Sequence, residues 1–230
     1  MRFSWTATWL LLLLAGCDWP GQPKETDRPI PAEKVEDFGK LYSTHCAGCH
    51  GADGKDGPAP PHNDPLFLAI VPDEVLRRVI AEGRSGTPMT AFAKDKGGPL
   101  TEKQIDIVAK GIKQRWAAPA RVEGQSPPYL LSAAKAGDKK AGLKVFARDC
   151  AMCHGEHGQG DDAGAINDPA FLELVSDQVL RRYIITGRPD FGMPNYADPK
   201  RNDADLTSQE INDLIALLAY WRVGGSTNGK

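Results

Sequence analysis

The sequence contains Cys46-Ala47-Gly48-Cys49-His50 and, 104 residues later, Cys150-Ala151-Met152-Cys153-His154. The register continues beyond these motifs, because 15 of the 27 residues from 63 to 89 are identical to those from 167 to 193. Self-similarity at a fixed offset is the signature of a tandem duplication. We therefore expect similar domains at residues 33–116 and 138–224, with a linker at 117–137 that is rich in proline, glycine and serine and a tail at 225–230.

Both motifs have the C-x-x-C-H spacing, which is typical of covalent haem c attachment. Two cysteines three residues apart on a turn can form thioethers with the two vinyl groups of one porphyrin, and the histidine that follows can bind the iron. The spacing therefore predicts two covalently attached haem c groups, one in each repeat. The predicted attachment residues are Cys46, Cys49 and His50 in the first repeat and Cys150, Cys153 and His154 in the second.

Other uses of paired cysteines fit the sequence less well. A four-ligand zinc site would draw on both pairs together, but each pair has its own histidine and lies in its own repeat. A thioredoxin-type dithiol would follow a strand in a βαβ unit, and the sequence has no such pattern. A structural disulfide across so short a loop would explain neither the adjacent histidine nor the duplication.

Two methionines recur in register, each 39 residues after the histidine of its repeat. Met89 and Met193 lie in loops rich in glycine and proline, rather than on the apolar helical face expected of a core methionine. Histidine and methionine are the axial pair of cytochromes c, so we expect these sulfurs to bind iron opposite His50 and His154. Met152 lies inside an attachment motif and is not expected to reach the opposite haem face.

The apolar spacing indicates helices and no convincing strand, so the predicted fold class is all-α. Residues 73–82 and 177–186 are expected to be helical, each followed by a glycine where a left-handed residue would end a helix. The last helix of each repeat is expected to begin at a capping box, at Thr101 and at Thr207. Each repeat alone has a limited core, and a haem would add apolar surface to it.

Four polar residues near the motifs each allow two interpretations. His62 and His157, which are not repeated, are expected to be solvated loop histidines, with alternative ligation or proton-linked tuning as the other interpretation. Arg84 and Arg188 are repeated, and they either favour the end of the preceding helix or pair with a haem propionate. The sequence does not choose between the two roles of the arginines.

Two further patterns predict how each repeat packs around its motif. The Asn-Asp-Pro triplets at 63–65 and 167–169 indicate helix starts, with a capping polar residue and proline in the first turn. Four aromatic side chains are expected in the core, near the haem or where helices cross: Tyr42, Trp116, Phe146 and Trp221.

Residues 1–16 are typical of an export signal, with a positive charge at Arg2 followed by an apolar segment. The stretch Leu14-Ala15-Gly16-Cys17 resembles a bacterial lipobox, in which the cysteine is diacylated and the preceding peptide removed. The resemblance implies a lipid anchor at Cys17, and Asp18 favours retention at the inner membrane. Residues 17–32 would then form an extended tether that places the protein on the periplasmic side.

Composition excludes nucleic acid as an expected partner. The chain has 28 basic and 30 acidic residues and a net charge of -2, without the basic face that phosphate binding needs. No apolar run reaches the roughly 20 residues of a membrane-spanning helix. The first repeat has 12 basic and 12 acidic residues and the second has 10 and 14, so the docking faces of the two repeats are expected to differ.

On these motifs the chain resembles class I cytochromes c, and more closely their diheme, two-domain members. The resemblance implies an all-α fold of two tandem class I cytochrome c domains. In that family a glycine and an aromatic residue of the first helix cross the last helix, a role that Gly39 with Tyr42 and Gly142 with Phe146 match. The stretch 86–89 is similar to the methionine loops of diheme subunits that serve terminal oxidases.

The resemblance implies a periplasmic electron carrier without catalytic residues. With histidine and methionine at both axial positions, iron has no vacancy for a substrate, which favours outer-sphere electron transfer. The expected partners are a quinol-oxidising or dehydrogenase complex as donor and a terminal oxidase or soluble protein as acceptor. Two alternatives stay open: a permanent cytochrome subunit of a larger oxidoreductase complex, and a diheme enzyme such as a peroxidase or thiosulfate dehydrogenase, which would need an open or unusual axial site.

Overall fold

The computed structural model describes residue 24 and residues 28–118, 126–131, 136–198 and 205–225. The chain divides into residues 1–34 and residues 35–230. In the first unit, η2 (Ala32–Lys34) is a single 3-10 turn in which the Lys34 amide donates to the Pro31 carbonyl at 2.8 Å. The predicted signal peptide and the predicted lipid anchor at Cys17 lie outside the described residues.

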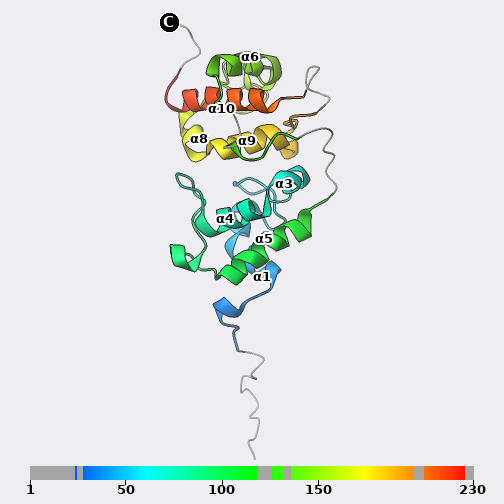
Figure 1. The fold of residues 1–230 in the computed structure, drawn as a ribbon, viewed down its shortest axis with the longest axis vertical. Helices are drawn as coiled ribbons and strands as arrows, with labels where there is room; N and C mark the ends of the chain where they lie inside the picture. Colours follow the sequence, from blue (N-terminus) through cyan, green and yellow to red (C-terminus); the bar gives the residue numbers. More distant parts are fainter. Residues whose placement is uncertain (1–23, 25–27, 119–125, 132–135, 199–204, 226–230) are drawn as a thin grey trace, which may run out of the picture. The chain divides into compact units, whose positions relative to one another are not determined.

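The second unit is built of helices in two repeats of the same order (Figure 1). The first repeat contains α1 (Phe38–His45), α2 (Ala47–His50), α3 (Pro65–Ile70), α4 (Asp73–Glu82), η3 (Lys94–Lys96) and α5 (Glu102–Trp116). The second contains α6 (Lys139–Asp149), α7 (Ala151–His154), α8 (Pro169–Leu174), α9 (Asp177–Thr186), η5 (Pro189–Phe191) and α10 (Ser208–Arg222). The only β-pairs within the described ranges are two isolated bridges. The predicted all-α class is confirmed, and α4 and α9 have the predicted bounds.

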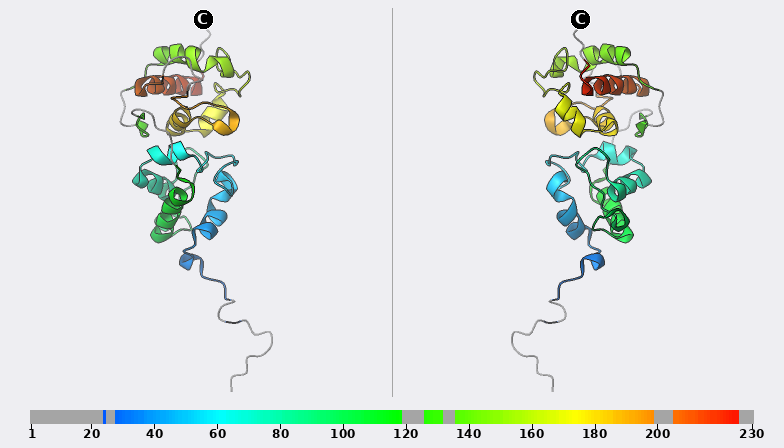
Figure 2. Two further views of the ribbon diagram at one scale, coloured as in Figure 1. Left: turned by 90° about the vertical axis from the view of Figure 1, so that its right-hand side faces the viewer. Right: turned by 90° about the vertical axis from the view of Figure 1, so that its left-hand side faces the viewer.

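Each repeat has its own hydrophobic core, and the two helical groups are seen separately in Figure 2. Tyr42 and Trp116 are buried in the first core, with ring centroids 4.9 Å apart. Phe146 and Trp221 are buried in the second, with centroids 5.2 Å apart. The four aromatic side chains therefore lie in the core as predicted, and each pair joins the first helix of its repeat to the last.

The crossing of the first and last helices differs between the repeats. In the second repeat, a Cβ added to Gly142 of α6 would lie 2.1 Å from the Asp213 carbonyl oxygen of α10, so backbones meet at this glycine. In the first repeat the glycine is on the last helix, because a Cβ on Gly111 would lie 2.1 Å from the Phe38 ring. The prediction that Gly39 lies at the crossing is wrong, since its Cβ would meet only a carboxylate oxygen of the helix cap, at 3.2 Å.

Helix starts follow the predicted signals. Thr101 and Thr207 each form a capping box with the side chain three residues further along. The helices α3 and α8 begin at Asp64 and Asp168, whose carboxylates accept backbone N–H groups, with proline at the first helical position. These caps fix where the loops that follow each C-x-x-C-H motif must end.

An arginine joins the second long helix of each repeat to the last helix. In the first repeat, Arg77 of α4 forms ion pairs with two carboxylates of α5. In the second, the fully buried Arg181 of α9 donates instead to the neutral Asn212 and Ser208 of α10, at 2.7 and 3.2 Å. Arg181 also donates to the Pro128 carbonyl at 2.7 Å, so part of the predicted linker packs on the second repeat.

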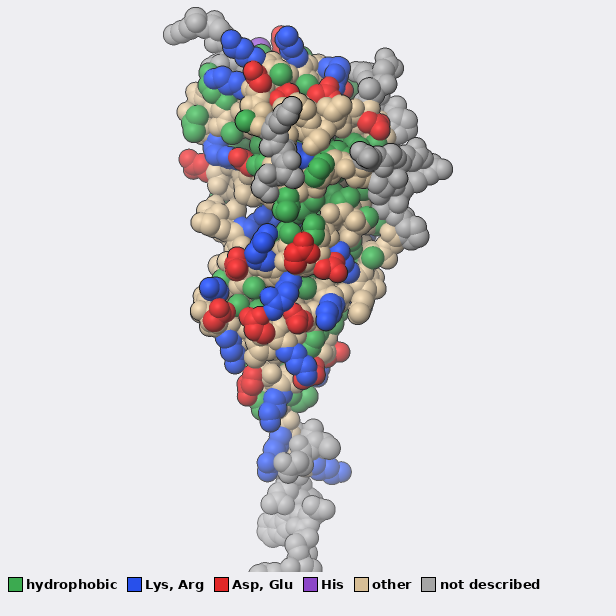
Figure 3. Space-filling model, viewed as in Figure 1, with side chains coloured by type: hydrophobic (Ala, Val, Ile, Leu, Met, Phe, Trp, Pro, Cys, Tyr) green, Lys and Arg blue, Asp and Glu red, His purple; other side chains and the backbone are tan. Residues whose placement is uncertain are grey.

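One face of the second unit mixes both signs of charge. On the face shown in Figure 3, basic and acidic side chains are interspersed. Within the part of the chain that the structure describes, no helix combines the length and apolar character needed to cross a bilayer.

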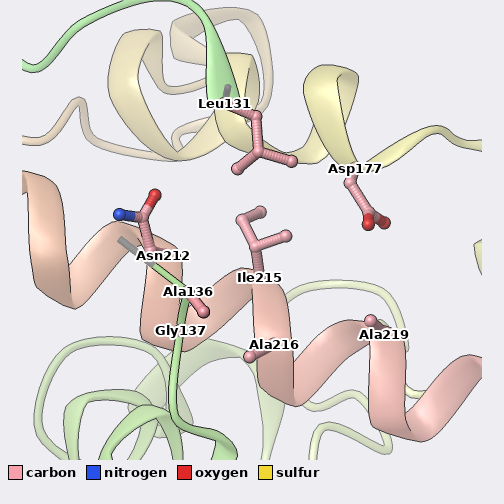
Figure 4. Close-up of a pocket in the computed structure, with 8 residues that line it drawn as sticks. All are labelled: Leu131, Ala136, Gly137, Asp177, Asn212, Ile215, Ala216 and Ala219. Atoms are coloured by element: carbon pink, nitrogen blue, oxygen red, sulfur yellow. The ribbon is translucent and has the colours of Figure 1, made fainter. Parts of the chain in front are cut away.

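A small pocket of about 190 Å³ lies beside α10 (Figure 4). It contains none of the predicted haem-binding residues. The residues that line it are Leu131, Ala136, Gly137, Asp177, Asn212, Ile215, Ala216 and Ala219.

We predict that Gly142→Ala weakens the second repeat, whereas Gly39→Ala does not weaken the first. The methyl group at position 142 would overlap the backbone of α10, and overpacking of this kind costs about 1–3 kcal/mol. Alanine at position 39 improves helix propensity and should change the free energy of unfolding by at most about 1 kcal/mol. Urea unfolding of the two purified variants measures the difference, and equal losses of stability would contradict the crossing described above.

Candidate functional site

The attachment motifs form tight turns at the end of the first helix of each repeat. The Cys46 amide donates to the Tyr42 carbonyl at 2.8 Å, and the Cys150 amide donates to the Phe146 carbonyl at 2.9 Å. The histidine that ends each motif lies one helical turn further on, in α2 and α7. Both motifs therefore present their two sulfurs and their imidazole from one short turn.

None of the four motif cysteines forms a disulfide. Burial, together with the neighbouring Cys49, raises the pKa of the Cys46 thiol to about 12. Cys49 itself is exposed, and Cys46 packs against the first core while Cys150 packs against the second. Because the two pairs belong to separate cores, the structure does not bring them together as the zinc alternative requires.

The motif histidines are oriented by the same hydrogen bond in both repeats. His50 Nδ1 lies 2.8 Å from the Pro60 carbonyl, and His154 Nδ1 lies 3.0 Å from the Gly164 carbonyl. A carbonyl can only accept, so Nδ1 carries a proton, and in the neutral ring Nε2 is the nitrogen whose lone pair is left for a metal. Burial lowers the pKa of His50, which favours the same neutral ring.

The methionine loops are held against the ends of α4 and α9. The Arg84 amide donates to the Met89 carbonyl at 2.8 Å, and the Arg188 amide donates to the Met193 carbonyl at 2.9 Å. Each loop packs directly on the glycine that ends the helix. A Cβ added to Gly83 would lie 2.6 Å from the Met89 carbonyl oxygen, and a Cβ added to Gly187 would lie 2.5 Å from the Met193 carbonyl oxygen.

The two helix-ending glycines have the positive φ that the sequence predicts. Gly83 and Gly187 have φ of 71° and 69°, but their ψ values of -162° and -169° are extended rather than left-handed helical. Glycine tolerates this conformation because it has no Cβ. The chain therefore turns sharply away from the helix and brings the methionine back beside it.

The interpretation of His62 as a solvated loop residue is wrong. His62 is 7% exposed, and its ring stacks on the His50 ring with centroids 3.8 Å apart. Its Nδ1 lies 3.0 Å from the Tyr42 hydroxyl, and burial lowers its pKa well below the ordinary value. His62 is thus a buried neutral side chain that packs on a predicted iron ligand. His157 is half-buried in its loop.

The repeated arginines after the helices have different neighbours. Arg84 donates to the Tyr129 hydroxyl at 3.4 Å. Arg188 pairs with Asp190 at 2.7 Å and lies over the Phe191 ring, 4.6 Å from its centroid. These contacts do not choose between the two roles that the sequence leaves open.

The asparagine and the aspartate of each Asn-Asp-Pro triplet have different roles. The aspartates cap α3 and α8, whereas Asn63 donates to the Asp53 carbonyl at 3.1 Å and Asn167 donates to the His157 carbonyl at 2.8 Å. Each asparagine bonds to the residue ten positions earlier and so closes the loop that carries the acceptor of the motif histidine.

The donor set of each repeat fits haem c. In each case one repeat supplies two thiols outside any disulfide, an imidazole whose Nδ1 is bonded to a loop carbonyl, and a thioether in a loop held at the end of a helix. The thiols can form thioethers with the vinyl groups of the porphyrin, and the imidazole and the methionine sulfur can bind the iron. The assignment of individual ligands stays a prediction.

Comparison with known families finds one match in each repeat. The family described as "Cytochrome C oxidase, cbb3-type, subunit III" matches residues 33–110, and the family described as "Cytochrome c" matches residues 140–221. The chain carries two cytochrome c domains. Such domains hold haem c covalently.

Curated relatives are named as cbb3-type cytochrome c oxidase subunits. The chain is 30% identical to subunit FixP of Bradyrhizobium sp. (strain ORS 278) over 64% of this chain and 50% of the relative. It is 31% identical to subunit CcoP of Azospirillum sp. (strain B510) over 55% of this chain and 41% of the relative. The chain therefore spans about half the length of the curated relatives it matches.

One solved structure is also similar to this c-type cytochrome. A chain of the Kuenenia stuttgartiensis reducing HAO-like protein complex superposes with a TM-score of 0.46 at 21% identity, over 84% of this chain and 99% of that chain. A likeness at this level supports no argument about function.

Several residues that build the sites carry no clear signal in the sequence. The acceptors of the two histidines are backbone carbonyls, at Pro60 and Gly164, and a backbone acceptor does not constrain residue type. Tyr129 lies in the predicted linker, but it is 4% exposed and packs on Phe67 of the first repeat. For His62, the only available hint is its place in a loop rich in proline.

We predict that Gly187→Ala disrupts the second methionine loop, whereas Gly192→Ala does not. Gly192 is left-handed helical, where alanine costs about 1–2 kcal/mol. Gly187 has a φ of 69° and a ψ of -169°, a region that is essentially restricted to glycine, so alanine costs more there. Only the Cβ at position 187 would collide with the Met193 carbonyl, at 2.5 Å, since nothing lies within 4 Å at position 192. The near-infrared methionine-to-iron band should lose about half its intensity in the first variant alone. Equal loss in both variants, or no loss in either, would contradict this description of the loop.

Proposed function

We propose that this protein is a diheme c-type cytochrome that carries electrons on the periplasmic side of the inner membrane. The observation that carries the proposal is the repeated hydrogen bond from each motif histidine to a loop carbonyl, at 2.8 and 3.0 Å. It leaves each Nε2 available for an axial bond. The proposed haem-binding residues are Cys46, Cys49, His50 and Met89 in the first domain and Cys150, Cys153, His154 and Met193 in the second.

The chain holds its two axial donors in fixed positions. When bound, haem c supplies an iron that cycles between the ferric and ferrous states. Hydrogen bonds to loop carbonyls fix the imidazoles, and the contacts at Gly83 and Gly187 fix the methionine loops. If His50 with Met89, and His154 with Met193, held the two irons, no coordination site would be left for a substrate. This arrangement supports outer-sphere electron transfer rather than catalysis.

The relatives support a respiratory setting for this electron transfer. Proteins that the chain resembles are subunits of cbb3-type cytochrome c oxidase. We place the chain between a quinol-oxidising or dehydrogenase complex as donor and a terminal oxidase or soluble protein as acceptor. The same names favour a second candidate, in which the chain is a permanent cytochrome subunit of an oxidoreductase complex.

The N-terminal sequence supports attachment to the membrane by lipid. Residues 1–16 would be removed as a lipoprotein signal peptide, and Cys17 would carry the acyl chains. Residues 17–32 would then act as the tether, with haem domains at 33–116 and 138–224, a linker at 117–137 and a tail at 225–230. The lipid rather than the polypeptide would hold the protein at the bilayer.

We predict two haem groups per chain that acid-acetone does not extract, because thioethers hold them covalently. The double variant Cys46→Ala/Cys49→Ala should retain one covalent haem, and so should Cys150→Ala/Cys153→Ala. Haem per polypeptide is measured from the pyridine haemochrome spectrum and the protein concentration. A colourless wild-type protein, or pigment that acid-acetone removes, would overturn the proposed function.

We predict that Cys17→Ser moves the protein from the membrane fraction to the soluble periplasmic fraction. Serine provides no thiol for diacylation, and the described helices offer no membrane span in its place. Haem staining after fractionation measures the distribution, with Asp18→Ser as a neighbouring control that keeps the cysteine. If Cys17→Ser had lost residues 1–16 and still stayed membrane-bound until detergent extracted it, the lipid anchor would be wrong.

A further inference from the structure

A buried arginine of the second domain contacts the first domain. Arg182 of α9 is 5% exposed, and its Nη2 donates to the Pro61 carbonyl. The same nitrogen lies 3.6 Å from the Asp64 carboxylate, and the guanidinium lies 3.5 Å from the Phe67 ring centroid. All three partners belong to the first domain, so one side chain of the second domain holds a short segment of the first.

The segment that Arg182 holds is the one that orients the first motif histidine. Pro61 directly follows Pro60, whose carbonyl accepts the hydrogen bond from His50 at 2.8 Å. Asp64 caps α3 by accepting from the Phe67 amide at 3.0 Å. Arg182 therefore acts on the loop between the histidine acceptor and the helix that follows it.

The positive charge of Arg182 is only partly balanced by its neighbours. Its Nε is buried and has no hydrogen-bond acceptor among the residues that the structure describes. Asp64, at 3.6 Å, is an ion pair without a short hydrogen bond. The guanidinium contacts the carbonyl of Pro61, the residue directly after the one whose carbonyl accepts from His50, so its charge lies close to the predicted ligand. In a poorly solvated site such a charge acts strongly on nearby groups.

The repeat supplies a natural comparison. Arg182 corresponds to Arg78 at the offset of 104 residues, and both are arginine. Arg78 is exposed, whereas Arg182 is buried against the other domain. The same residue type therefore has two different environments in one chain, and only the second copy lies beside a haem-binding loop of the partner repeat.

We propose that Arg182 is a positioning residue for the first haem site, which raises its reduction potential from the neighbouring domain. A fixed positive charge favours the ferrous state, because reduction removes one positive charge from the iron. The first haem would thus be tuned by contact with the second domain. This inference rests on the proposed function, since it requires a haem at Cys46, Cys49 and His50.

The test is a spectroscopic redox titration of the purified diheme protein and five variants, of which four test Arg182 and one assigns the first haem. Arg182→Gln removes the charge, Arg182→Lys keeps it, Asp64→Asn removes the opposing charge, and Arg78→Gln is the matched control. Asparagine remains a good helix cap, so Asp64→Asn changes charge while keeping the start of α3. Met89→His in the wild-type background identifies the first haem, because replacing the methionine ligand lowers its potential.

The proposal predicts shifts of opposite sign for the two partners. Arg182→Gln should lower the reduction equilibrium constant of the first haem about tenfold, which is about 59 mV for a one-electron couple. Asp64→Asn should raise it, while Arg182→Lys and Arg78→Gln should leave it within about threefold of the wild type. The second haem should shift less than the first in every variant.

A purely structural role of Arg182 would give a different pattern. In that case lysine would fail to rescue, or Asp64→Asn would shift the potential in the same direction as Arg182→Gln, and either result overturns the proposal. If Arg182→Gln does not accumulate, Asp64→Asn and Arg182→Lys decide the sign and the rescue. The haem content of the wild-type protein is measured first. A wild-type protein without two haem groups would count against the proposed function. Unchanged potentials in variants that keep both haem groups would count against Arg182 alone.

Discussion

The hydrogen bond from each motif histidine to a loop carbonyl is the interaction on which both sites depend. It spans ten residues in both repeats, from His50 to Pro60 and from His154 to Gly164. The bond fixes the tautomer and the orientation of the imidazole together. Three other residues of each repeat support this arrangement. An asparagine closes the loop and an aspartate caps α3 or α8. The glycine that ends α4 or α9 brings the methionine back beside that helix.

The two domains preserve this interaction while changing what surrounds it. At the helix crossing, the bulky residue and the glycine have exchanged helices, with Phe38 on Gly111 in one repeat and Gly142 on α10 in the other. Arg77 faces carboxylates, whereas Arg181 is buried against neutral partners. The second domain therefore buries two arginines, Arg181 and Arg182, and Arg182 contacts the first domain.

Features that repeat a local pattern could be predicted from the sequence. The all-α class, the bounds of α4 and α9 and the capping boxes at Thr101 and Thr207 depend on residues close in the chain. The prediction for Gly39 was wrong. At the offset of 104 residues, the residue that corresponds to Gly142 is Phe38 and not Gly39.

Features that depend on contacts distant in sequence could not be read from the chain. The burial of His62 depends on the ring of His50 and the hydroxyl of Tyr42, which meet it only in the folded domain. The contact between Arg182 and Pro61 joins residues 121 positions apart. At the corresponding position of the first repeat the residue is also arginine, but Arg78 is exposed. The acceptor carbonyls at Pro60 and Gly164 leave no mark on residue type, so only the structure reveals them.

We expect each iron to be held by imidazole on one side and methionine sulfur on the other. Extended X-ray absorption fine structure at the iron edge of the purified protein measures this ligation directly. The account predicts an average of one sulfur and five nitrogens around each iron. An average of half a sulfur or none, or five-coordinate iron, would contradict it.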